Sequence, residues 1–230
     1  MTKNQSEREG SFFVVAIDGG AASGKSSTSR LLAVQCHFLH VDTGAHYRAV
    51  ALACQEAGIG PEETEELASF LDNLTLESTI RAHESLVSFS GRPPPTEKAL
   101  RSEAVNRTVS GYAAEPLVRE AVKAYQREQV EVARRNGFKG VVLDGRDIGT
   151  VILPHADLKI FLVADSAMRQ KRRLREGGSD VVADRDERDS SRAVAPLRPA
   201  ADAVTIDNSA IPLEEVVGLI RARLGLPPSQ

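Results

Sequence analysis

The stretch Gly19-Gly20-Ala21-Ala22-Ser23-Gly24-Lys25-Ser26 decides the fold, because it has the pattern G-x-x-x-x-G-K-[ST]. An apolar run, 12–17, precedes it, and a run with helical spacing, 27–35, follows it. Strand, glycine-rich turn and helix in that order predict a phosphate-binding loop, in which backbone N–H groups and the helix N-terminus surround an anion. We expect Lys25 to reach the β- and γ-phosphates of a nucleoside triphosphate, and the Ser26 hydroxyl to ligate Mg²⁺. The residues predicted to contact the triphosphate are Gly19, Gly20, Ala21, Ala22, Ser23, Gly24, Lys25, Ser26 and Ser27.

Composition and charge narrow the class of protein. The chain has 230 residues, of which 41% are apolar and 27% charged, which is typical of a globular protein with one substantial core. A net charge of −3 argues against a nucleic-acid polymer as partner. Cys36 and Cys54 form no C-x-x-C pair, which favours a reducing cytoplasm. Residues 1–10 are predicted to be a disordered tail with no signal peptide, and no apolar run reaches the length of about 18 residues that a membrane span needs.

Strand-like and helix-like segments alternate along most of the chain. Because each expected strand is almost entirely apolar, the pattern predicts an α/β fold with a parallel sheet covered by helices on both faces. Ligands of such sheets bind at the carboxyl ends of the strands. Strands are expected at 12–17, 37–42, 140–144, 158–164 and 203–207. Helices are expected at 27–35, 46–57, 62–71, 115–136, 166–177 and 213–224. Pro116 in the first turn and Gly137 after the last one mark the helix at 115–136, and Ser166 is expected to cap the helix at 166–177. Nothing in the apolar pattern requires a partner chain, so a monomer is the default expectation.

The segment 73–112 interrupts this alternation. Partial alternation of apolar and polar residues from 75 to 89 predicts two or three short strands. Three prolines, 93–95, then form a loop, and Thr96 is expected to cap one helix that runs to Ser110. The segment is therefore predicted to be a small inserted subdomain, between the two parts of a core at 11–72 and 113–230.

Acidic and basic residues gather where the predicted strands end. Asp144 ends an apolar strand, as the Mg²⁺-binding acid of many nucleotide sites does, although a turn-capping role is equally open. Planar guanidinium groups match the oxygens of a transferring phosphoryl group. Any single arginine is more often a solvated surface charge, and for Arg185, Arg188 and Arg192 the alternative is a solvated helix face. The candidate arginines are Arg48, Arg119, Arg146, Arg185, Arg188 and Arg192.

Four stretches together resemble bacterial cytidylate kinases. The resemblance covers about residues 13–224, and the second and third stretches are specific to that family, whereas the phosphate loop is shared by many. The stretches are Ile17-Asp18-Gly19 with Ser23-Gly24-Lys25-Ser26, Asp42-Thr43-Gly44-Ala45-His46-Tyr47-Arg48, Asp144-Gly145-Arg146-Asp147-Ile148-Gly149-Thr150-Val151, and Arg188-Asp189-Ser190-Ser191-Arg192-Ala193-Val194-Ala195-Pro196-Leu197.

The resemblance implies transfer of the γ-phosphoryl group of ATP to CMP or dCMP, with Mg²⁺ as cofactor. It further implies that 73–112 is the monophosphate-binding insert and that about 172–192 is a lid. The residues it assigns to the acceptor's phosphate and sugar are Thr43, Tyr47 and Arg48. Those assigned to cytosine are Ser110, Arg119 and Asp147. Those assigned to phosphates or to lid closure are Arg146, Arg185, Arg188, Asp189 and Arg192. The catalytic set is Lys25, Arg146, Arg188 and Arg192, and the metal set is Ser26 and Asp144.

Two departures from the family pattern stand out. His46 replaces a hydrophobic residue, often methionine, and the stretch 177–185 is short, which predicts a small lid that still closes. Three other functions remain as alternatives. The first is a kinase for UMP, AMP or a small alcohol. The second, a GTP-dependent switch, lacks the usual [NT]-K-x-D motif. The third is a non-catalytic nucleotide-binding module.

Overall fold

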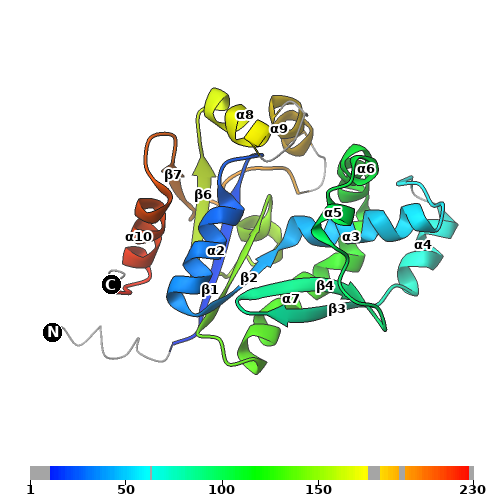
Figure 1. The fold of residues 1–230 in the computed structure, drawn as a ribbon, viewed down its shortest axis with the longest axis horizontal. Coiled ribbons are helices and arrows are strands. Elements are labelled where there is room, and N and C mark those ends of the chain that lie inside the picture. Colours follow the sequence, from blue (N-terminus) through cyan, green and yellow to red (C-terminus); the bar gives the residue numbers. More distant parts are fainter. Residues whose placement is uncertain (1–10, 63, 176–181, 192–194, 228–230) are drawn as a thin grey trace.

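The computed structural model describes residues 11–62, 64–175, 182–191 and 195–227, so the tail predicted at 1–10 lies outside it (Figure 1). The strands are β1 (Phe13–Gly19), β2 (Phe38–Asp42), β3 (Leu76–Arg81), β4 (Glu84–Phe89), β5 (Gly140–Gly145), β6 (Leu158–Val163) and β7 (Val204–Asp207). The helices are α2 (Lys25–Cys36), α3 (Thr43–Glu56), α4 (Glu65–Asp72), α5 (Glu97–Leu100), α6 (Glu103–Ala114), α7 (Pro116–Arg135), the short π-helical turn η1 (Ile148–Ile152), α8 (Ser166–Arg175), α9 (Val182–Ser190) and α10 (Leu213–Arg223).

The strands form one seven-stranded sheet in the order β3-β4-β2-β5-β1-β6-β7. Every neighbouring pair is parallel except β3 and β4, which are antiparallel. The α/β class with a mostly parallel sheet is thus confirmed. β1 lies inside the sheet between β5 and β6, so the phosphate loop leaves the sheet from an interior strand.

Side chains of β1 alternate between the two faces of the sheet, as the period of two in a strand requires. Val15 and Ile17 pack with Leu32 of α2 and Val217 of α10 on one face. Ala16 packs on the other face with residues of β2, β5 and η1 and with Ala133 of α7. Figure 1 shows α2 and α10 side by side, and both helices contribute to the same cluster of apolar side chains. Both faces of the sheet are covered, which explains why the strands are apolar throughout.

Helix boundaries differ from the predictions where the capping side chain of the structure was not recognised in the sequence. The helix predicted to begin at 62 begins at Glu65, because Thr64 accepts a hydrogen bond from the N–H of Leu67 and Pro61 precedes it. The single helix predicted after Thr96 is two helices, α5 and α6, because Ser102 caps a second start. The basic helix α8 is capped by Asp165, whose carboxylate accepts two backbone N–H groups, and not by the following serine.

The β3–β4 hairpin continues the central sheet. β4 pairs in parallel with β2, with His40 opposite Glu84 and Val41 opposite Ser85. Gln129 of α7 secures the hairpin, because its amide oxygen accepts a hydrogen bond from the Ser85 hydroxyl at 2.6 Å. The division of the chain into core, insert and lid stays a prediction. No described helix is both long and apolar enough to cross a bilayer.

Candidate active site

A cleft of about 500 Å³ lies at the carboxyl ends of the central strands. The phosphate loop, the start of α3, the end of α6, the start of α7 and the turn after β5 all contribute to its walls. The structure thus brings together residues that are more than a hundred positions apart in the sequence. The predicted site residues that line the cleft are Ala21, Ala22, Ser23, Gly24, Lys25, Ser26, Ser27, Thr43, Tyr47, Arg48, Ser110, Arg119, Asp144, Arg146, Asp147 and Asp189.

The phosphate loop has the backbone that its glycines allow. Gly24 adopts a φ of +91°, a conformation that side-chain-bearing residues rarely take, and it directly precedes the first turn of α2. The Lys25 ammonium donates to the carbonyl oxygen of Gly20 at 2.7 Å. Burial, helped by the nearby charge of Arg146, lowers the pKa of Lys25 to about 7 despite the acidic side chains around it. An incoming phosphate would add negative charge beside Lys25 and so favour its protonated form.

Asp144 is the centre of a buried polar cluster behind the phosphate loop. One of its carboxylate oxygens accepts from the Ser26 hydroxyl at 3.1 Å, and the other lies 2.6 Å from Nε2 of His40. Burial opposes the charge of both groups, but their hydrogen bond outweighs it, so the pKa of Asp144 is lowered and that of His40 is raised to about 9. In the described part of the chain no group of three or more His, Cys, Asp or Glu side chains is arranged to hold a metal ion. Ser26 and Asp144 therefore fit only an ion whose other ligands come from phosphate and water.

The turn after β5 packs tightly against the start of α3. The Thr43 hydroxyl donates to the carbonyl oxygen of Asp144 at 2.7 Å. A Cβ added to Gly145 would lie 2.6 Å from that same hydroxyl, so a glycine is needed for this approach. The turn then delivers Arg146 and Asp147 into the cleft side by side.

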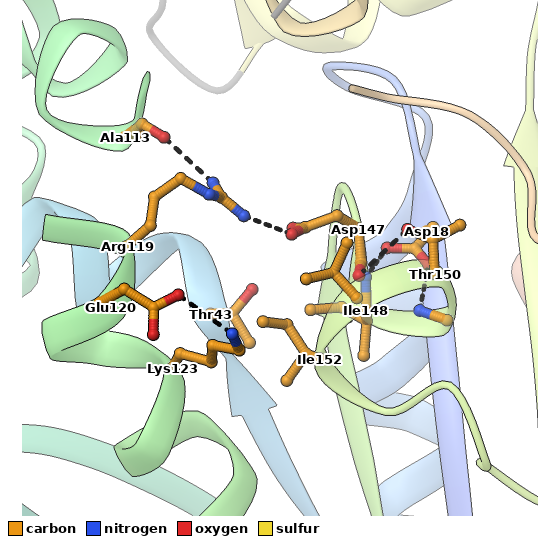
Figure 2. A network of polar contacts seen from close by, with 12 residues as sticks. Asp18, Thr43, Ala113, Arg119, Glu120, Lys123, Asp147, Ile148, Thr150 and Ile152 are labelled. Atoms are coloured by element: carbon orange, nitrogen blue, oxygen red, sulfur yellow. Dashed lines mark hydrogen bonds and ion pairs between the residues drawn. The ribbon is translucent and has the colours of Figure 1, made fainter. Parts of the chain in front are cut away.

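Arg119 and Asp147 form a buried ion pair in the same cleft as the phosphate loop (Figure 2). Only 6% of Arg119 and 4% of Asp147 is exposed. Arg119 also donates to the carbonyl oxygen of Ala113 at 3.0 Å, and its guanidinium lies over the ring of Tyr47, 5.6 Å from the centroid. Arg48 is held nearby, where it donates to the side chain of Asn106 at 2.7 Å. These contacts fix a planar donor and a carboxylate acceptor next to each other.

Arg146 joins three parts of the site. It donates to the carbonyl oxygen of Gly19 at 2.5 Å, and its Nε lies 2.9 Å from a carboxylate oxygen of Asp189 on α9. Asp189, which lies in the segment predicted to be the lid, therefore forms an ion pair with Arg146. Arg185 and Arg188 fall on α9, but their side chains lie outside the described residues, as does the whole of Arg192.

Several acidic or basic groups in or beside the cleft were not predicted, among them Arg30, Glu97, Arg101 and Arg173 of its lining. His40 was read only as part of an apolar strand, although a histidine two positions before Asp42 shares the face of that acid. Asp186 accepts from the N–H of Ala21 at 2.7 Å and pairs with Arg169, so α9 also touches the phosphate loop. Asp18 was noted only as the end of a strand. Burial raises the pKa of its carboxyl group to about 6, against two backbone hydrogen bonds that lower it.

Comparison with known proteins extends over nearly the whole chain. The family model described as cytidylate kinase matches residues 15–224. The chain belongs to the cytidylate kinase family. The cytidylate kinase of Nocardia farcinica is 41% identical over 215 residues, which cover 89% of this chain and 90% of the relative. That of Pelotomaculum thermopropionicum is 40% identical over 225 residues, with 93% and 96% covered. The resemblance deduced from the four motifs is therefore confirmed.

Two kinases of known structure are more distant in sequence than these cytidylate kinases. A sugar kinase from Janibacter sp. HTCC2649 aligns over 94% of this chain and 96% of its own, with a TM-score of 0.49 and 12% identity. A shikimate kinase from Acinetobacter baumannii aligns over 96% and 97%, with a TM-score of 0.46 and 11% identity. Likenesses this remote say nothing about the substrate of the chain.

Proposed function

We propose that this chain transfers the γ-phosphoryl group of ATP to CMP or dCMP, giving CDP or dCDP and ADP. The observation that carries the proposal is the buried Arg119–Asp147 pair, which shares one cleft with the phosphate loop. The family and the names of its relatives support the same activity. An oxygen of the acceptor's phosphate attacks the γ-phosphorus, and the bond to the β-phosphate oxygen breaks, so no protein nucleophile is needed.

Phosphoryl transfer of this kind depends on positioning and charge neutralisation. Backbone N–H groups of the phosphate loop and the ammonium of Lys25 bind the donor phosphates, and Arg146 stands between the loop and the acceptor. We assign phosphate contacts from the lid to Arg185, Arg188 and Arg192, in line with the sequence motif that contains the last two. Asp189 holds Arg146 by an ion pair, which orients the guanidinium before substrates arrive.

The residues present fit Mg²⁺ brought in with ATP. The Ser26 hydroxyl and the Asp144 carboxylate are adjacent, and Mg²⁺ bound with nucleotides takes only one or two protein ligands and several waters. When bound, the ion neutralises phosphate charge. His40 orients the Asp144 carboxylate from the other side, as groups behind a metal ligand often do.

Acceptor recognition falls to the part of the cleft that contains Arg119 and Asp147. Cytosine offers an amino donor next to acceptors, and uracil replaces that donor by a carbonyl oxygen. The Asp147 carboxylate accepts from the amino group, and Arg119 donates to the cytosine acceptors, with Ser110 beside them. We assign the phosphate and the sugar of the acceptor to Thr43, Tyr47 and Arg48.

Coarser features of the enzyme complete the proposal. The hairpin β3–β4 with α5 and α6 forms the monophosphate-binding insert, and α8 with α9 forms the lid. The protein acts in the cytoplasm as a monomer.

The test is an assay of ADP formation with Mg²⁺ and ATP, in which CMP, dCMP, UMP and AMP are offered separately. Fast turnover with CMP and dCMP and slow turnover with the others is expected. A reaction without acceptor gives the background of ATP hydrolysis. Preference for UMP or AMP would overturn the acceptor assignment. ATP binding without any acceptor-dependent turnover would favour a non-catalytic module.

A further inference from the structure

The carboxylate of Asp18 binds the backbone of a segment far away in the sequence. Asp18 lies near the end of β1 and is only 4% exposed. One oxygen accepts from the N–H of Ile148 at 2.8 Å, and the other accepts from the N–H of Gly149 at 2.7 Å (Figure 2). The pairing of β1 with β5, which places Asp18 opposite Gly145, brings these groups together.

The two N–H groups belong to the first turn of η1, which starts directly after Asp147. N–H groups at the start of a helix lack partners within the helix, and an aspartate at the preceding position usually accepts from them. Asp147 holds that position but makes no such bond, because its carboxylate pairs with Arg119. Asp18 supplies the missing cap from another strand.

Asp18 and Gly19 hold the neighbouring residues Arg146 and Asp147 in place. The carbonyl oxygen of Gly19 accepts from Arg146, while the carboxylate of Asp18 anchors the turn that follows Asp147. The start of the phosphate loop is thus connected to the cytosine-facing wall by three hydrogen bonds. Both oxygens of Asp18 are engaged with backbone N–H groups, an arrangement that suits anchoring.

We propose that Asp18 is a positioning residue that caps η1 in place of Asp147, and so lets the Asp147 carboxylate face Arg119 and the cytosine. This inference rests on the proposed role of Asp147 in acceptor recognition. Without the cap, the Asp147 side chain would turn back to its own helix start, as aspartates at helix starts generally do. Discrimination between cytosine and uracil would then fall, while the binding of ATP would be less affected.

The substitution Asp18→Asn tests this directly, because it keeps the size of the side chain but turns an NH₂ group against one of the two N–H groups. Loss of a charged hydrogen bond predicts a KM for CMP about tenfold higher and a ratio of kcat/KM for CMP over UMP about tenfold lower. The KM for ATP is expected to change by less than about twofold, since no donor contact of the phosphate loop is removed.

A matched control exists at the other end of the same strand. The carboxylate of Asp157 accepts from the N–H of Val14 at 2.7 Å, so Asp157→Asn makes the same substitution at an aspartate that binds the backbone of β1 away from the cleft. That variant should keep the CMP-to-UMP ratio and both KM values. Asp147→Asn serves as the benchmark, because it alters the recognition group itself and should lower the ratio at least as much as Asp18→Asn.

The outcomes separate the two levels of the proposal. If Asp147→Asn lowers the ratio and Asp18→Asn does not, the positioning role of Asp18 is overturned while acceptor recognition by Asp147 stands. If Asp147→Asn leaves the ratio unchanged, the recognition role fails and the inference fails with it. A fall in kcat for both acceptors with unchanged KM values would show a merely structural role. Should Asp18→Asn fail to fold, Asp18→Glu keeps the charge but displaces the oxygens by one methylene, and it must lower the same ratio.

Discussion

His46 is a buried histidine whose two ring nitrogens have no hydrogen-bond partner among the described residues. It lies in the first turn of α3, is fully buried, and packs its ring edge-on against Tyr125 with 4.8 Å between centroids. Burial disfavours the protonated ring and lowers its pKa to about 3, although the charge of Asp144 acts in the opposite direction. Because a methionine would fill this apolar position without leaving ring nitrogens unpaired, we predict that His46→Met stabilises the fold.

The size of the effect depends on pH in a way that the pKa shift determines. The unfolded ring titrates near 6.5, whereas the folded ring stays neutral down to about 3. The contribution of neutral His46 to the free energy of unfolding is therefore fully present above pH 6.5 and is lost as the pH falls toward 3. The cause is that His46 binds a proton in the unfolded chain but not in the folded one. At pH 5 this loss amounts to about 2 kcal/mol. At pH 7.5 the variant gains only what the unpaired nitrogens cost, about 1 kcal/mol.

Urea unfolding of both proteins at pH 7.5, 6 and 5 measures this difference. We expect the gap in unfolding free energy to widen by about 2 kcal/mol between pH 7.5 and pH 5. The control is His155→Met, which makes the same substitution at an exposed position. A constant gap between wild type and His46→Met would refute the reasoning, since it would mean that the folded protein accepts the proton on His46.

Two further predictions concern the phosphate side of the cleft. Lys25→Met removes the buried cation of the phosphate loop and should lower kcat/KM for ATP by about 100-fold or more in an ADP-release assay; a loss below about tenfold would contradict its role. Asp144→Asn weakens the site beside the Ser26 hydroxyl, and a Mg²⁺ titration at saturating ATP should show a midpoint about tenfold higher. An unchanged midpoint would assign Asp144 to the turn alone.

The elements with the clearest local signals were predicted from the sequence. The apolar run that became β1 needed no tertiary information, because an interior strand of a covered sheet is apolar on both faces. The helix α7 was bounded correctly by Pro116 at its start and Gly137 after its end, since each residue has a backbone geometry suited to that place. The phosphate loop was recognised from the spacing of its glycines and lysine, and Asp144 from its place at the end of an apolar strand.

Features that depend on distant partners were missed. The pairing of β4 with β2 rests on two opposed residue pairs that are more than forty positions apart, and no local pattern marks it. The turn η1 is too short for periodicity to reveal. Asp18 near the end of β1 and His40 in the middle of β2 show no partner until the fold places the 148–149 backbone and Asp144 against them. Assignment of α8 to a Ser166 cap failed because two adjacent residues were both good caps, and only the structure shows that Asp165 is used.

The strand order also has a consequence for how the chain is made. β1 and β2 are synthesised early, but they share no hydrogen bonds with each other, because β5 lies between them in the sheet. A ribosome adding about 5–20 residues per second leaves β1 without any strand beside it for on the order of ten seconds. During that time an apolar segment ending in the phosphate loop is exposed to chaperones and to other nascent chains. Emergence of 140–145 from the ribosome is therefore the event that joins the two halves of the nucleotide site.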